Sequence, residues 1–180
     1  TSATGNVLLN DTDVDSTDTP SANGAVVAVR ETTAGTDTTV DAGTNSGNGR
    51  QLAGRYGTLH IGADGTYQYV VDQTNADVHG LRTASQFLVE SFTYTLEDAG
   101  GLDDESVLSI TIYGSNDAPV ALDDTATAVE AGGVSNGTAG ASGTGNVLAN
   151  DTDEDSVASG ETKTVTAVRT GAEGSSGTAV

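Results

Sequence analysis

The sequence predicts an all-β protein built as an antiparallel β-sandwich. Short segments alternate apolar and polar residues with a period of two, and turns rich in Gly, Asn and Asp separate them. No segment carries the 3.6-residue periodicity of a long amphipathic helix. Short strands without intervening helices favour two packed sheets over an α/β fold, and an immunoglobulin-like arrangement is the expected one.

The first predicted hairpin joins residues 59–61 to residues 67–71. Both segments alternate apolar and polar side chains, and Ala63-Asp64-Gly65 lies between them. An Asp-Gly pair between alternating segments is a strong hairpin signal, because glycine accepts the positive φ that tight turns require.

A second hairpin joins residues 92–96 to residues 108–112 through the acidic, glycine-containing turn 97–104. Residues 26–31 form a further predicted strand. Residues 76–86 are the only stretch expected to form a helical turn.

The aromatic residues indicate where the core lies. All of them fall between Tyr56 and Tyr113, so the core is expected there. Residues 32–54 and 131–145 are rich in Gly, Thr and Ser without periodicity and are predicted to be long, mobile loops.

A long-period repeat organises the chain. Residues 4–16 (TGNVLLNDTDVDS) recur as residues 144–156 (TGNVLANDTDEDS), which sets a period of about 140 residues. We therefore expect residues 1–115 to be most of one β-sandwich repeat of a tandem array. Residues 116–180 are then the incomplete start of the next repeat. Alternatively, a strand at residues 120–129 completes the first sandwich, giving a closed monomer or a strand-swapped dimer.

The charge of the chain limits its partners. Its formal net charge is −20, from 26 acidic and 6 basic residues. Such a field repels nucleic acids and anionic lipid surfaces, so neither nucleic-acid binding nor direct membrane insertion is expected. The chain has no Cys, which removes disulfides and thiolate metal sites. Multivalent cations, calcium first, are the expected means of neutralising part of this charge on folding.

The repeated motif carries the strongest candidate metal ligands. A loop that brings several carboxylates together favours a cation, and calcium accepts six to eight such oxygens. The spacing is not that of an EF-hand, because Ser16 and Ala22 occupy the positions of its Gly and Glu. A solvated acidic turn without metal is the alternative. The candidate ligands are Asp11, Asp13, Asp15 and Asp18 in the first copy and Asp151, Asp153 and Asp155 in the second.

Two further acidic sets are candidates for calcium. One lies in the turn of the second hairpin, and the other lies at the junction between the repeats, where a cation would stiffen the array. Each set is equally compatible with ordinary solvated turns. The hairpin set centres on Asp98 and Asp103, with Glu97 and Asp104, and the junction set on Asn116 and Asp117, with Asp123 and Asp124.

Enzymatic activity is not expected. His60 and His79 have no plausible catalytic partner nearby, and the chain has no phosphate-binding glycine motif. A pair of carboxylates could imitate a glycosidase, but the acids cluster in turns and the chain lacks the aromatics of a sugar cleft.

Several motifs taken together resemble the VCBS repeat and the related bacterial cadherin-like repeats. They are residues 56–69 (YGTLHIGADGTYQY), 92–98 (FTYTLED) and 108–114, followed by Asn116-Asp117-Ala118-Pro119, which is similar to a shortened cadherin linker. The acidic loop NDTDVD is also similar to that of the cadherin-like repeats. The resemblance implies an extracellular, calcium-bound sandwich found in tandem in large surface adhesins of Gram-negative bacteria, which are exported by type I secretion.

The expected function is therefore that of a structural repeat. The module would extend a biofilm adhesin from the cell surface and would contact neighbouring repeats of its own chain. The alternatives are a module that binds a carbohydrate or surface ligand, and an accessory domain of a secreted hydrolase.

Overall fold

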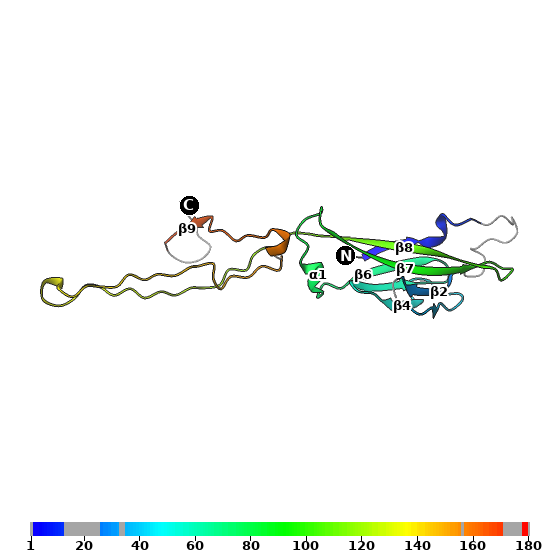
Figure 1. Cartoon of the computed structure of the whole chain (residues 1–180), viewed down its shortest axis with the longest axis horizontal. Helices are drawn as coiled ribbons and strands as arrows, with labels where there is room; N and C mark the ends of the chain where they lie inside the picture. Colours follow the sequence, from blue (N-terminus) through cyan, green and yellow to red (C-terminus); the bar gives the residue numbers. More distant parts are fainter. Residues whose placement is uncertain (1, 13–25, 33–34, 156, 171–177, 180) are drawn as a thin grey trace. The chain divides into compact units, whose positions relative to one another are not determined.

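The computed structural model describes residues 2–12, 26–32, 35–155, 157–170 and 178–179 (Figure 1). The chain divides into two compact units, Thr1–Ser115 and Asn116–Val180. Unit 1 contains both large sheets, and unit 2 has little regular structure among its described residues. The units are described separately below.

Unit 1 is an all-β sandwich of two antiparallel four-stranded sheets. The first sheet has the order β1-β6-β5-β4, with β1 Ser2–Asn6, β6 Thr66–Val71, β5 Gly57–Ile61 and β4 Arg50–Ala53. The second has the order β3-β2-β7-β8, with β3 Thr38–Thr39, β2 Val26–Glu31, β7 Phe87–Glu97 and β8 Asp103–Tyr113. The predicted all-β sandwich is confirmed, while its immunoglobulin-like type stays a prediction.

The core lies between the two sheets. Alternate residues of β5 point inward, so that Leu59 and Ile61 are fully buried. They meet the inward face of β7, where the Phe92 ring lies 6.0 Å from that of Tyr69 on β6. Burial of these side chains removes apolar surface from water and is the main force that holds the sheets together.

The turn between β5 and β6 forms where the sequence predicts it. Gly65 has φ +78°, a conformation that residues with a Cβ rarely adopt. The Asp64 carboxylate accepts hydrogen bonds from the backbone N–H of Thr66 (2.9 Å) and from its hydroxyl (2.6 Å). The paired strands run from Gly57↔Val71 to Ile61↔Tyr67, which confirms this hairpin.

The second predicted hairpin and the predicted helical turn are also present. Residues 76–86 are not the only helical stretch, since 3-10 turns form at Val7–Leu9, Val134–Asn136 and Val157–Ser159. β7 and β8 pair over eleven residues from Phe87↔Tyr113 to Glu97↔Asp103. The short helix α1, Ala76–His79, begins after Asn75, whose side-chain oxygen accepts hydrogen bonds from the backbone of Asp77 and Val78. This is ordinary N-capping, which satisfies donors that the first helical turn leaves unpaired.

The prediction that residues 32–54 form a structureless loop is wrong. This segment contributes β3 and β4, and Val40 is buried at 3% exposure. Both strands lie at sheet edges, where one neighbour supplies the backbone hydrogen bonds. A polar strand at a sheet edge does not need alternating apolar residues. The search for such alternation in the sequence therefore did not detect β3 and β4.

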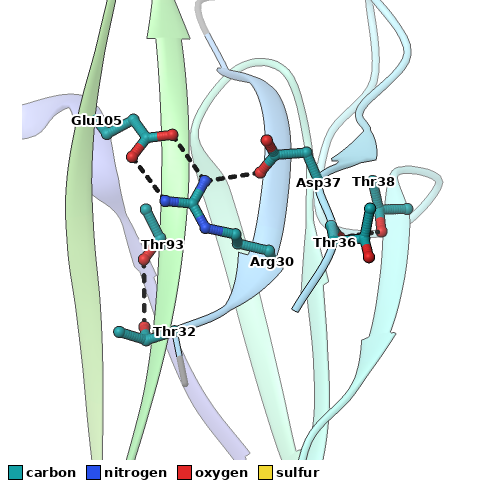
Figure 2. Close-up of polar contacts among 7 residues, drawn as sticks. All are labelled: Arg30, Thr32, Thr36, Asp37, Thr38, Thr93 and Glu105. Atoms are coloured by element: carbon teal, nitrogen blue, oxygen red, sulfur yellow. Dashed lines mark hydrogen bonds and ion pairs between the residues drawn. The ribbon is translucent and has the colours of Figure 1, made fainter. Parts of the chain in front are cut away.

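An exposed ion-pair cluster links β2 and β8 across β7 (Figure 2). The Arg30 guanidinium on β2 donates two hydrogen bonds to the Glu105 carboxylate of β8, at 2.7 and 2.6 Å, and a third to Asp37 at 2.7 Å. The hydrogen bonds from Arg30 lower the pKa of Glu105 below its ordinary value. A two-pronged contact of this kind fixes geometry better than a single pair.

Unit 2 begins with an extended ribbon rather than a sheet. Isolated antiparallel bridges join Val120 to Thr152, Val129 to Ala141 and Gly132 to Thr138, around the turn η2 at Val134–Asn136. The remaining elements are η3 at Val157–Ser159 and the two-residue pair β9 Ala167–Val168 and β10 Thr178–Ala179. Among the described residues, the bridges formed by residues 120–129 are to partners within unit 2. The division of the chain into two repeats stays a prediction.

Candidate metal centre

The second acidic motif and the junction set lie together in unit 2. The backbone N–H of Asp117 donates to the Asp155 carboxylate (2.8 Å), and that of Leu122 donates to Asp151 (2.9 Å). The side-chain amide of Asn150 donates to the backbone carbonyl of Asp123 (3.1 Å). Two sets of residues that the sequence analysis treated separately therefore form one cluster.

Two carboxylate oxygens of this cluster are buried without a hydrogen-bond partner among the described atoms. They are Oδ2 of Asp153 and Oδ1 of Asp155. Asp155 is only 4% exposed, and its backbone N–H donates to the other oxygen of Asp153 at 3.0 Å. Removing an ionised carboxylate from water is costly unless a cation or donor compensates it. These atoms are thus the best candidates for a cation contact.

A basic side chain of unit 2 also contacts the cluster. The Lys163 ammonium donates to the backbone carbonyl of Asp151 rather than to a carboxylate. In the part of the chain that the structure describes, no three His or acidic side chains converge closely enough to form a ready-made metal site. A metal would therefore have to draw ligands inward or take backbone and water oxygens to complete its shell.

The first copy of the motif is described only in part. Asp11 accepts a hydrogen bond from the Tyr94 hydroxyl of β7, at 3.0 Å to the nearer oxygen. Burial, and to a lesser extent this contact, raise the pKa of Tyr94, while a hydrogen bond from Ser106 opposes the rise. Asp13, Asp15 and Asp18 lie outside the described residues.

The hairpin set forms a turn whose polar groups form hydrogen bonds within the turn. The Asp98 carboxylate accepts from the backbone N–H of Leu102 (2.8 Å), and Gly101 supplies the positive φ of +82°. Glu97 lies directly across the ladder from Asp103 at the end of the strands. Like charges opposite each other are mildly destabilising. In this turn Asp98 has a structural role that requires no metal.

Glu90 is a buried acid that the sequence analysis missed. It lies on the inward face of β7 at 5% exposure and accepts hydrogen bonds from the Tyr69 hydroxyl and the backbone N–H of Arg55. Burial, followed by the contact with Glu90, raises the pKa of Tyr69. The signal was present, because Glu90 falls in the same alternating register as Phe92 and Tyr94.

A shallow polar cavity of about 270 Å³ lies on the surface of unit 1 and is lined by Thr39, Asp41, Gly49, Arg50 and Gln51. No aromatic side chain lines it. Two aromatic rings are exposed elsewhere, at the end of the β7–β8 ladder, where Phe87 and Tyr113 lie 6.2 Å apart.

Comparison with known proteins found no matching family model, curated protein or solved structure. Within the described ranges, no helix has the length and apolar character needed to span a membrane.

Proposed function

We propose that this protein is a calcium-stabilised structural repeat of a large bacterial surface adhesin. The buried, unpaired oxygens of Asp153 and Asp155 carry the calcium part of the proposal. The recurrence of the motif, its resemblance to the acidic loop of the cadherin-like repeats, and the resemblance of the hairpin motifs to the VCBS repeat support the rest. In this role the module acts outside the cell and its partners are the neighbouring repeats of its own chain.

The acidic cluster suggests how calcium would act. Residues 151–155 already hold the junction segment through the backbone N–H groups of Asp117 and Leu122. A cation at Asp153 and Asp155 would neutralise the two buried carboxylates, and so would stabilise the loop that makes these contacts. Because the unfolded chain does not gather these ligands, calcium binding would contribute directly to the folding free energy of unit 2.

The test is a calcium titration followed by thermal unfolding, with magnesium and chelator for comparison. Free calcium at about 100 times its Kd should stabilise the native state by about 2.7 kcal/mol. The double variant D153N/D155N should lose this effect. E154Q is the matched control, because Glu154 lies between them and is exposed.

An equal calcium response in D153N/D155N and in the parent protein would remove these two carboxylates as ligands. A melting temperature that is the same in calcium and in chelator would remove calcium from the proposal altogether, and the acidic loops would then be solvated turns.

A second candidate function is carbohydrate binding, and the exposed pair of Phe87 and Tyr113 favours it. Phe87 is 56% and Tyr113 64% exposed, and neighbouring exposed rings offer a surface on which a sugar can stack. A glycan array on the full chain tests this function, with F87A/Y113A as the control that should lose any signal.

A further inference from the structure

One five-residue sequence occurs in two different environments in this chain. Residues 4–8 and residues 144–148 are both Thr-Gly-Asn-Val-Leu. In unit 1 the Val of this sequence, Val7, is 6% exposed, whereas its counterpart in unit 2, Val147, is 54% exposed. The difference lies in what each copy packs against.

In unit 1 the sequence docks on the β5–β6 hairpin. Residues of β1 pair with β6 in the register Thr4↔Gln68, Gly5↔Tyr67 and Asn6↔Thr66. The Asn6 amide donates to the carbonyl of Asp64 and the Val7 N–H donates to that of Gly65, both at 3.0 Å.

Gly5 fits this docking because the end of the Tyr67 side chain lies close to it. A Cβ built at Gly5 would lie 2.7 Å from the Tyr67 hydroxyl oxygen, so any larger residue there would force the Tyr67 ring to move. The sequence therefore matches this hairpin in two ways: Gly5 has no side chain where the Tyr67 ring lies, and the neighbouring residues form the hydrogen bonds given above.

In unit 2 the same sequence keeps the hydrogen-bonded turn at its Asn, although residues 144–146 are not part of a strand. The Asn146 side chain accepts from the N–H of Leu148 at 3.0 Å, and the equivalent bond from Leu8 to Asn6 in unit 1 is 2.8 Å. A Cβ at Gly145 would meet no atom within 4 Å. The turn at Asn146 is thus already formed while Val147 is exposed, which lowers the conformational entropy that this turn would lose on docking.

We propose that residues 144–148 of one molecule dock along β6 of a second copy of this chain, in place of that copy's β1. The occupant is a second copy because this chain itself contains the complementary hairpin, with the register and contacts given above. The contacts that residues 144–148 would make with β6 are the same as those that β1 makes. Their exchange is therefore opposed by the covalent tether that keeps β1 near its own sheet, and it is favoured by a high protein concentration. The contact is head-to-tail, because the donor segment and the receiving strand are different surfaces of the chain.

Charge repulsion should limit this association at low salt. Each chain has a formal net charge of −20, and the Debye length falls from about 10 Å at 0.1 M salt to about 3 Å at 1 M. Association through residues 144–148 should therefore strengthen as salt is added, which distinguishes it from contacts made by opposite charges.

The decisive experiment compares glycine variants of the full chain by analytical ultracentrifugation over a range of concentrations in 0.5 M salt, a condition of strong screening. Gly5→Val should weaken the docking of β1 and expose β6, so this variant should oligomerise more strongly than the parent. Adding Gly145→Val should lower the association constant at least about tenfold, because the new side chain meets Tyr67 of the receiving copy. Gly132→Val is the matched control, since a Cβ there also meets no atom within 4 Å.

Equal association of G5V and G5V/G145V, whether both are monomers or both aggregate, overturns the proposal. The proposal is also overturned if G5V/G132V loses as much of the association constant as G5V/G145V does. Should Gly5→Val prevent folding, the milder Gly5→Ala serves in the same scheme. A synthetic peptide of residues 142–150 provides an independent readout. It should raise the melting temperature of the opened chain, whereas the same peptide with Val at position 145 should not.

Discussion

At the scale of single residues, the molecule holds two kinds of buried carboxylate. Glu90 in the core of unit 1 is satisfied by a tyrosine hydroxyl and a backbone N–H, so its environment is complete. Asp155 in unit 2 has one oxygen bonded to the backbone of Asp117 and the other without a partner among the described atoms. The first arrangement is typical of a structural group, and the second of a group that gains from a cation.

Replacing Glu90 tests the structural role. Glu90→Ala removes the shared acceptor of Tyr69 and of the Arg55 backbone and leaves a cavity between the sheets. The free energy of unfolding should fall by about 3 kcal/mol. Urea unfolding measures it, and the control Glu97→Ala, on the exposed end of the same strand, should change it by less than about 0.5 kcal/mol. A loss for Glu90→Ala no larger than that control would show that the buried contacts contribute nothing net.

At the scale of elements, the turn between β5 and β6 combines two constraints on one residue. Gly65 has positive φ, and a Cβ there would lie 2.5 Å from the Leu8 side chain. Gly43 has a similar φ of +76° but has no atom within 4 Å of its Cβ position. The two glycines therefore separate backbone strain from packing.

Alanine substitution at the two positions makes this separation measurable. Gly43→Ala should lower the free energy of unfolding by about 1 to 2 kcal/mol, from strain alone. Gly65→Ala should cost at least about 1 kcal/mol more, because Leu8 must also move. Equal losses, measured by urea unfolding of both variants, would show that Leu8 yields freely and that its packing on this turn is loose.

The elements also show how far sequence patterns predict this fold. The two hairpins were predictable because apolar alternation and Gly-containing turns act within a few residues. β3 and β4 were not, because their partners β2 and β5 supply the hydrogen bonds that hold them. The candidate metal centre was predictable as two acidic sets but not as one cluster, since Asp117 and Asp155 are joined by a contact between residues far apart in sequence. Glu90 was overlooked because the predicted strand began at residue 92, whereas β7 begins at Phe87 and carries the same alternation through Glu90.

At the scale of the whole molecule, the two units differ in what stabilises them. Unit 1 has a continuous core of buried side chains from both sheets. In unit 2, Asp155 is the only buried residue among those described, and its apolar side chains such as Val134 and Val157 are largely exposed. Burial of apolar surface is the dominant favourable term in folding, so unit 1 should be the more stable of the two.

Calorimetry should resolve this difference as two unfolding transitions. The lower one belongs to unit 2 and should move upward in calcium, while the upper one should stay nearly constant. In D153N/D155N the lower transition should no longer respond. A single transition that shifts as a whole would show instead that the two units unfold together.

The positions of the first and last strands of unit 1 decide how this sandwich bears tension. The start of β1 and the end of β8 lie at the same end of unit 1 (Figure 1). A pull on these two ends acts across the strands rather than along them. It would peel the β1–β6 ladder open from Ser2↔Val70, one of its five pairs at a time, instead of shearing them all together. Since a backbone hydrogen bond contributes only about 1 kcal/mol net, β1 would be the first mechanical yield point of the unit.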